Sequence, residues 1–545
     1  MAEAESTQIA GRPRTGRATA IVSVAVMCSR VLGLIREVAF TALFGTRDLS
    51  IFIASFRIPN LLRDLFAEGA LSTAFITVFS RKIAKEGDAS AWRLAHKIGT
   101  LTFVVMGIIT LLGIYFAPNL VSLVADGFEG QDAVLTAQLT ATMFPFILMV
   151  SVAAQVMGML NAKHVFGWPA MASSFFNIGS IVGGLTIGWF IDRGFGQRAL
   201  FGLAYGTLIG GFLQLAVQIP PLLRAGYRPR LDFRFRDPGV FEVLKIMAPA
   251  VISAAAVQVN VMVNTSFAAD LRYVPGQEGA IAWLNNAFRL MQLPLGIFGV
   301  AIATVSLPLL SKNIALGNRD DFRANLAKGI RLVFFLTIPS SVGLWMLGEP
   351  IMSVIYQHGS KVTHHDVVQS AHALRYYALG LTAYAGMKVL APAFYALDRR
   401  KTPMMVSFFS IALNYGLNAY FVRLGWGHQG LAMSTGCVAL TNFALLYWLM
   451  RREIGQLDTR RLIISLVKIF LAADAMALVC LGCDWLFLSK WDKMGFLLQA
   501  LALGLTITLA IAAFAAVARA LKLREMQDVI DAVNRKLSRN RSTSN

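Results

Sequence analysis

The chain has 545 residues, of which 56% are hydrophobic and only 15% are charged, and its formal net charge is +20. A soluble domain carries roughly 25% charged residues, so this composition excludes an ordinary soluble protein. Apolar runs of membrane-spanning length follow one another almost from end to end. Because these runs are continuous rather than alternating, they predict helices and not a barrel. The basic residues lie in short loops between the runs, which argues for membrane topology and against nucleic acid binding.

The apolar runs predict an all-α polytopic membrane protein with about fourteen transmembrane helices. In chain order we expect the spans at 18–44, 49–79, 94–116, 134–160, 168–190, 198–220, 239–268, 279–311, 325–347, 367–397, 403–423, 429–450, 463–487 and 495–519. Residues 1–17 are polar and basic and lack a signal-peptide cleavage site, so we expect a cytoplasmic N-terminal segment there. Residues 521–545 are expected to form a basic cytoplasmic tail.

The basic residues of the loops are distributed unevenly. The N-terminus and every second loop together carry 29 Lys and Arg residues, whereas the opposite loops carry eight. Cytoplasmic loops of membrane proteins hold the excess of Lys and Arg, so both termini are expected in the cytoplasm. This placement requires an even number of spans.

Three sequence landmarks recur at a nearly constant distance along the chain. The matched segments are 55–57 and 287–289, 161–169 and 398–403, and 202–204 and 430–432, with offsets of 232, 234 and 228 residues. This spacing predicts two six-helix lobes of the same orientation, an N-lobe at 18–220 and a C-lobe at 221–450, with a substrate site between them. The two spans within 451–520 lie outside the repeat.

Ionisable residues lie inside several predicted spans, where they are costly and usually face a water-filled cavity. Lys388, Arg36 and Arg57 are close enough to span ends for their side chains to extend to the membrane interface. Arg30, Arg63 and Arg289 are more central and favour a functional site. The full set, in chain order, is Arg30, Arg36, Glu37, Arg57, Arg63, Asp64, Glu68, Arg289 and Lys388.

Arginine suits an anionic substrate, because its guanidinium group stays charged at low dielectric and grips phosphate oxygens through two hydrogen bonds. Arginines from both halves would therefore suit a pyrophosphate. Glu37, Asp64 and Glu68 would hold the arginines when the site is empty, or they form permanent structural ion pairs; composition alone leaves both alternatives open. Pro59, with Asn60 beside it, is expected to kink span two as part of a moving element.

The chain contains no Walker motif, no Gly-rich nucleotide loop and no catalytic triad pattern, so we expect neither an enzyme nor a cofactor. Transport would instead be driven by an ion gradient, the membrane potential or substrate flow. His358, His364, His365 and His372 have no accompanying cysteine or carboxylate set, so we interpret them as exposed loop residues rather than metal ligands.

Several strings resemble the MurJ/MviN family. They are Ser29–Gly33 with Arg36, Pro59–Arg63 followed by Phe66–Ala70, Gly299–Ala301 running to Pro308, and Lys388–Pro392 followed by Lys401–Pro403. The resemblance covers about residues 20–520 and implies the fold of the multidrug/oligosaccharidyl-lipid/polysaccharide exporter superfamily. It implies a bacterial inner-membrane protein that flips lipid II, the undecaprenyl-pyrophosphate-linked disaccharide-pentapeptide of peptidoglycan. The last two spans would then form a groove for the lipid tail.

By the same resemblance, Arg30, Arg36, Arg63 and Arg289 match the family's central cationic cavity, and Glu37 matches an acidic position beside it. The chain departs from the family where acids are replaced by Phe288, Gln292 and Ser50, and where Asp64 follows Arg63 in place of a second arginine. These departures put in question a gate that pairs a span-eight acid with span-one arginines. A sodium site, known in some members, has only weak candidates here, which are Asn414, Asn418 and Thr435.

Three functions remain open from the sequence. The first is a lipid II flippase that works by alternating access between the two lobes. The second is an exporter of another undecaprenyl-pyrophosphate-linked glycan, or of a drug, although several arginines argue against a drug. The third is a non-transporting scaffold or paralogue. Lipid II and membrane lipids are the expected partners, with coupling to a monovalent cation or to the membrane potential.

Overall fold

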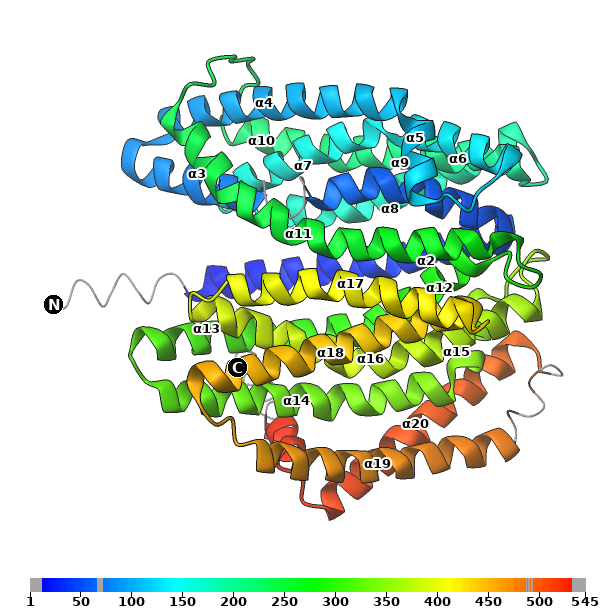
Figure 1. Cartoon of the computed structure of the whole chain (residues 1–545). Coiled ribbons are helices and arrows are strands. Elements are labelled where there is room, and N and C mark those ends of the chain that lie inside the picture. Colours follow the sequence, from blue (N-terminus) through cyan, green and yellow to red (C-terminus); the bar gives the residue numbers. More distant parts are fainter. Residues whose placement is uncertain (1–11, 66–71, 487, 489–490, 492–493, 532–545) are drawn as a thin grey trace. The chain divides into compact units, whose positions relative to one another are not determined.

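The computed structural model describes residues 12–65, 72–486, 488, 491 and 494–531. Within these residues the chain is helical and contains no strand (Figure 1). Contacts divide it into two compact units, one made of residues 1–282 with 359–361 and the other made of the remainder. The first unit contains α2 (Arg12–Arg63), α3 (Ser72–Glu86), α4 (Asp88–Tyr115), α5 (Ala117–Val124), α6 (Gly130–Met143), α7 (Pro145–Ala162), α8 (Gly167–Ile191), α9 (Leu200–Ala216), α10 (Ile219–Arg224) and α11 (Pro238–Asp270).

The second unit is formed by the helices after α11. They are α12 (Ala280–Pro294), whose first residues belong to the first unit, α13 (Val300–Ala315), α14 (Arg319–Met346), α15 (Gly348–Tyr356), α16 (His364–Ala396), α17 (Lys401–Arg423), α18 (Gly427–Ile454), α19 (Thr459–Leu486) and α20 (Phe496–Ala520). Contacts thus group α11 with the first unit, whereas the repeat begins the C-lobe at residue 221. The lobe boundaries stay a prediction.

The helices agree with the apolar runs of the sequence. Among the described residues ten helices are long and apolar enough to cross a membrane, and a bent pair, Pro238–Pro249 with Ala254–Tyr273, would make an eleventh. The three other expected spans, one, two and ten, fall on α2, α3 and α16, which are helical but do not belong to that apolar set. The polytopic all-α fold is therefore confirmed, and the count of fourteen spans is approximate. The sequence did not predict the short helices α5 and α15, which lie in interhelical loops.

The internal repeat is visible in the backbone of the turns. Left-handed residues, with φ between 51° and 93°, occur at matched interhelical turns of the two halves, always 229 to 234 residues apart. The pairs are Gly45 and Gly276, Gly87 and Gly317, Gly130 and Gly359, His164 and Asp398, Phe195 and Gly425, and Gly226 and Gly455. Because L side chains rarely adopt this conformation, six matched occurrences extend the three sequence landmarks to every turn of the repeat.

Close helix packing in the first unit depends on small residues. A Cβ added at Gly202 of α9 would lie 2.3 Å from the backbone nitrogen of Gly188 in α8, and one at Gly206 would lie 2.4 Å from that of Gly184. Membrane helices associate through such close backbone contact, because lipid supplies no hydrophobic drive between them. The α8–α9 pair thereby forms a rigid support, and α8 in turn packs against α2.

The second unit has its core where α14, α16, α18, α19 and α20 meet, with α19 and α20 drawn in orange to red in Figure 1. Residues 524–531, the described start of the predicted basic tail, are helical and contact α14 through acids. Glu525 lies 3.3 Å from Arg331, and Asp528 accepts a hydrogen bond from Lys328 at 2.7 Å. Residues 532–545 and 1–11 lie outside the described part of the chain.

Candidate functional site

Most of the predicted site residues lie on α2, whose helix is interrupted at two points. Gly45 has φ 72° and ψ 168°, which breaks the helix between the first and second expected spans. Pro59 lies inside the second part and removes the N–H that would bond to the carbonyl of Ser55. The Thr140 hydroxyl of α6 donates to that carbonyl at 3.2 Å, in a buried position. The backbone group freed by Pro59 is therefore satisfied by a neighbouring helix, as a membrane interior requires.

A polar cluster surrounds Asp64, immediately after the end of α2. One carboxylate oxygen of Asp64 accepts hydrogen bonds from Nε and Nη2 of Arg63, at 3.2 and 2.9 Å. The other oxygen accepts from Asn60 at 3.5 Å and from Gln258 of α11 at 3.1 Å. The side chains of Arg63 and Asp64 are 21% and 28% exposed, so water only partly screens the pair. Asp64 thus holds Arg63 and joins α2 to α11.

The space beside this cluster is small. Arg57, Asn60, Gln258 and Val261 contribute to the lining of a cavity of about 10 Å³ between α2 and α11. A cavity of roughly 10–15 Å³ holds one water molecule. This cavity is therefore too small for a phosphate group.

A second cluster on α2 surrounds Arg36. Its guanidinium group lies 5.3 Å from the centre of the Phe176 ring in α8, and its Nη2 lies 3.9 Å from Glu37, which is buried. Asn177, next to Phe176, donates to the backbone carbonyl of Ser29 at 3.0 Å. The rigid α8 thus fixes this part of α2 and supports the arginine through a cation–π contact. The Arg30 side chain, by contrast, is exposed in the first unit.

Arg289 belongs to the second unit, on α12, where it is half-buried. Its neighbour Phe288, at the position where the family resemblance leads us to expect an acid, makes an edge-to-face contact with Tyr377 at 5.4 Å between ring centres. The acidic function at this position is therefore replaced by aromatic packing between α12 and α16. A separate buried acid, Asp366, accepts a hydrogen bond from Trp283 Nε1 at 2.9 Å and caps α16.

The weak sodium candidates lie on two helices, α17 and α18. Asn418 donates to the side-chain oxygen of Asn414 at 3.3 Å, and both residues are buried in α17. The Thr435 hydroxyl donates to the carbonyl of Leu431 in its own helix, α18, at 2.9 Å. In the described segments, no three His, Cys, Asp or Glu side chains are placed to hold a metal ion. Sodium binding stays an untested prediction.

The remaining predicted residues have varied positions. Glu68 lies outside the described residues. Lys388 is exposed on α16, and His364 and His365 are exposed at its start. His358 and His372 were also expected to be exposed but are half-buried, with hydrogen-bond contacts to Val354 and Gln429.

Three residues of the two α2 clusters were missed from the sequence. Gln258, Phe176 and Asn177 contact the site from α11 and α8. The same reasoning that singled out charged residues inside spans would have found Gln258 if it had been extended to uncharged polar side chains. Phe176 carries no such signal, because aromatic residues are common in any apolar helix.

Comparisons with known proteins agree over most of the chain. Residues 40–503 match the family model described as lipid II flippase MurJ. A probable lipid II flippase MurJ of Bdellovibrio bacteriovorus is 34% identical over 509 residues, covering 92% of this chain and 94% of that protein. The lipid II flippase MurJ of Burkholderia cenocepacia is 33% identical over 444 residues, with coverage of 80% and 84%.

Solved structures show the same fold. A lipid II flippase MurJ in an inward closed conformation superposes with a TM-score of 0.75 at 25% identity, over 92% of this chain and 99% of that one. An inward-facing multidrug resistance transporter of the MATE family, in the MOP superfamily, gives a TM-score of 0.67 at 14% identity, over 81% and 99%. The second likeness concerns the fold alone.

Proposed function

Because the chain belongs to the MurJ family of lipid II flippases, we propose that it carries lipid II from the cytoplasmic to the periplasmic leaflet of a bacterial inner membrane. The observation that carries this proposal is the family match over residues 40–503. Arginines within the predicted spans, on α2 and α12, support it. The disaccharide-pentapeptide is too polar to cross hydrocarbon unaided. Both termini would lie in the cytoplasm, in agreement with the excess of basic residues in alternate loops.

In the proposed mechanism Arg30, Arg36, Arg63 and Arg289 bind the pyrophosphate. A guanidinium group binds phosphate through paired N–H donors and keeps its charge at low dielectric. Arg63 is occupied by Asp64 in this conformation, so an arriving pyrophosphate would compete with that carboxylate for the same N–H groups. Asp64, held also by Asn60 and Gln258, would then keep its position while Arg63 turns to the substrate.

Alternating access would follow from the two halves acting as lobes on either side of this site. Glu37 and Asp64 would hold the arginines between transport cycles, and the helices within 451–520 would cover the lipid tail. Transport would be coupled to a monovalent cation or to the membrane potential. The chain contains no motif for hydrolysing a nucleotide.

Complementation tests this proposal in a bacterium whose own lipid II flippase is shut off. At equal protein levels in the membrane, the wild-type chain should restore growth, whereas Arg30→Ala, Arg63→Ala and Arg289→Ala should each fail. Arg193→Ala is the matched control, because it removes an exposed arginine that stacks on Trp189, and it should restore growth fully.

A second cargo is favoured by one observation. Phe288 packs on Tyr377 where the family resemblance leads us to expect an acid, which changes the chemistry beside Arg289. If the wild-type chain reaches the membrane and does not rescue growth, the cargo is another undecaprenyl-pyrophosphate-linked glycan, or the chain is a non-transporting paralogue. Accumulation of a different lipid-linked glycan after deletion of the native gene would distinguish these two outcomes.

A further inference from the structure

A cavity of about 480 Å³ lies in the second unit, where three interhelical segments meet, and none of its lining residues belongs to α2 or α12. Its walls include Arg319 at the start of α14, residues 397–399 between α16 and α17, and Glu453 near the end of α18. Its volume falls in the range of small-molecule sites, which runs from roughly 300 to 1,000 Å³. In the predicted topology this end of the helices faces the cytoplasm.

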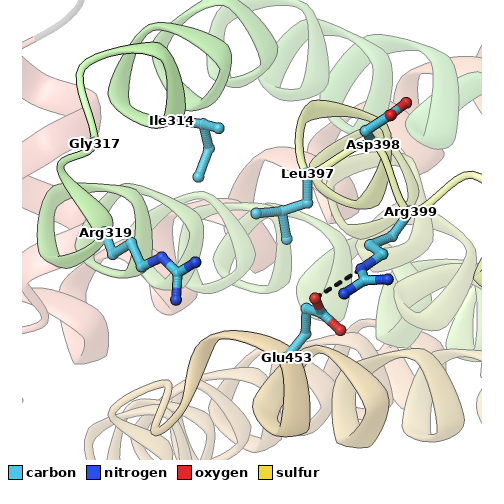
Figure 2. Close-up of a pocket in the computed structure, with 7 residues that line it drawn as sticks. All are labelled: Ile314, Gly317, Arg319, Leu397, Asp398, Arg399 and Glu453. Atoms are coloured by element: carbon cyan, nitrogen blue, oxygen red, sulfur yellow. Dashed lines mark hydrogen bonds and ion pairs between the residues drawn. The ribbon is translucent and has the colours of Figure 1, made fainter.

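In the part of the chain that the structure describes, some of the charged side chains around the cavity form ion pairs and one does not. Arg399 donates to Glu453 at 2.8 Å, and Asp398 lies 3.7 Å from Arg400. Within the described residues no carboxylate lies within 4.0 Å of the Arg319 guanidinium group. Figure 2 shows Arg319 extending towards the Arg399–Glu453 pair, with the Asp398 carboxylate directed away. The cavity therefore presents two exposed arginines, Arg319 without a carboxylate partner among the described residues and Arg399 paired with Glu453.

The cavity also has an apolar side. Ile314 and Leu397 project side chains into the same space, as Figure 2 shows. A phosphate alone would use only the arginines. A phosphate ester with a small organic part would also cover these two apolar side chains.

The internal repeat supplies a comparison within the same molecule. The turn at His164 in the first half matches the turn at Asp398 in the second, and both residues are left-handed. In the first half the preceding residue is Lys163, which lies 2.6 Å from Asp88 and covers the ring of Trp92. In the second half Leu397 takes the place of that lysine and Asn318 the place of Asp88. The second turn therefore has no counterpart of the Lys163–Asp88 ion pair, because Leu397 and Asn318 are uncharged. Arg319, beside Asn318, remains available to an anionic ligand.

From these observations we infer that the cavity at Arg319 is a binding site for a phosphate ester, separate from the transport site. Arg319 and Arg399 contact the phosphate, while Ile314 and Leu397 contact the organic part. The ester belongs either to a soluble phosphomonoester or to the headgroup of an anionic phospholipid, because both present the same chemistry at this end of the helices. The inference does not depend on which glycan the chain transports.

Binding of two probes to the purified full-length protein tests the inference. Glycerol 3-phosphate is titrated against the protein in detergent and followed by ³¹P line broadening, and retained phosphatidylglycerol is counted by native mass spectrometry. Arg319→Ala should weaken binding of the true ligand about tenfold, as expected for one charged hydrogen-bonding group. Leu397→Glu should weaken it as well, because it places a negative charge in the cavity. Arg93→Ala, which removes an exposed arginine from α4, is the matched control.

The two probes distinguish the source of the phosphate. Loss of glycerol 3-phosphate binding in Arg319→Ala assigns a soluble ester, and loss of phosphatidylglycerol retention alone assigns the lipid. Thermal unfolding without ligand identifies a variant that is simply misfolded, and Arg319→Lys then replaces Arg319→Ala, with partial binding expected. If both probes bind wild type, Arg319→Ala and Arg93→Ala equally, or bind none of them, the inference is overturned.

Discussion

The ends of α11 and its middle are held to the first unit in different ways. At its C-terminal end, Arg272 donates to Asp132 at 2.7 Å and to the carbonyl of Arg47 at 2.8 Å, and its side chain is 3% exposed. At its N-terminal end, Lys97 donates to Asp237 at 2.6 Å. In its middle, the neutral side chain of Gln258 donates a hydrogen bond to Asp64 at 3.1 Å.

The contacts at the two ends involve charged groups, whereas the Gln258 contact has a neutral donor. Removing one partner of a buried ion pair strongly destabilises the folded protein. A partly exposed hydrogen bond contributes only about 1 kcal/mol to stability. The helix also bends by 46° between Pro238–Pro249 and Ala254–Tyr273. Ion pairs at both ends and a neutral hydrogen bond to the Asp64 cluster between them are the arrangement that we expect beside a substrate site. Four changes test this comparison.

The largest effect is expected from Arg272→Ala. It leaves the half-buried carboxylate of Asp132 without its cation and removes the stacking on Phe128, so stability should fall by about 3 kcal/mol. The thermal midpoint of the purified protein measures the loss. Arg193→Ala, which removes an exposed arginine that also stacks on an aromatic ring, should leave the midpoint nearly unchanged. Equal midpoints for the two variants would contradict an anchoring role for Arg272.

A smaller effect is expected from Asp237→Asn at the other end of α11. Lys97 loses its carboxylate partner, and the hydrogen bond to the N–H of Gly239 weakens, so stability should fall by about 1–2 kcal/mol. Asp232→Asn is the control in the same loop, because Asp232 pairs with the exposed Arg234 and should contribute little to stability. A loss from Asp232→Asn as large as that from Asp237→Asn would remove the distinction between anchor and loop.

The same anchor should respond to acid. Burial alone would raise the pKa of Asp237, but hydrogen bonds from Lys97 and Gly239 and the charges of Lys97 and Lys82 bring it below its usual value of 3.8. Because the folded pKa is the lower one, the stabilisation is present at neutral pH and is lost as pH falls below 3.8. The thermal midpoints of wild type and Asp237→Asn, measured over a series of acidic pH values, should therefore converge below that pH. A gap of constant size would exclude the ionised carboxylate as its cause.

The smallest change in stability, and the clearest change in transport, is expected from Gln258→Leu. The free energy of unfolding should fall by about 1 kcal/mol or less, because one partly exposed hydrogen bond is lost. Rescue of growth should fall several-fold, because α11 loses its direct link to the carboxylate that holds Arg63. Gln258→Asn, which keeps an amide on a shorter side chain, should give an intermediate result. Full rescue by Gln258→Leu would show that the middle of α11 does not act on the site.

The membrane fold could be predicted because length and apolarity alone define a spanning helix. Within the described residues every expected span falls largely on helices. The charge pairs Arg36–Glu37 and Arg63–Asp64 were foreseeable because their members are adjacent in sequence. Contacts between helices were not foreseeable in the same way. Gln258 and Phe176 reach the site from helices far away in the chain, and hydrophobic patterning does not specify which helix faces which.

The turns show a similar limit. Glycines at matched positions could be aligned, but His164 and Asp398 share a left-handed conformation without sharing a residue type. The loss of Lys163 at the second turn is a single substitution in the sequence. Only the packing of the surrounding loops turns that substitution into a cavity.

The Thr140 hydroxyl lies within hydrogen-bonding distance of two carbonyls, those of Ser55 in α2 and Thr136 in its own helix, at 3.2 and 2.7 Å. A hydroxyl carries one hydrogen, so it serves only one acceptor at a time. If α2 straightens or withdraws from α6, the donor rotates to Thr136 and is never left without an acceptor. Separating the two helices at Pro59 therefore leaves only the Ser55 carbonyl without a partner, because the Thr140 hydroxyl keeps an acceptor. The contact can therefore open at a small cost in free energy.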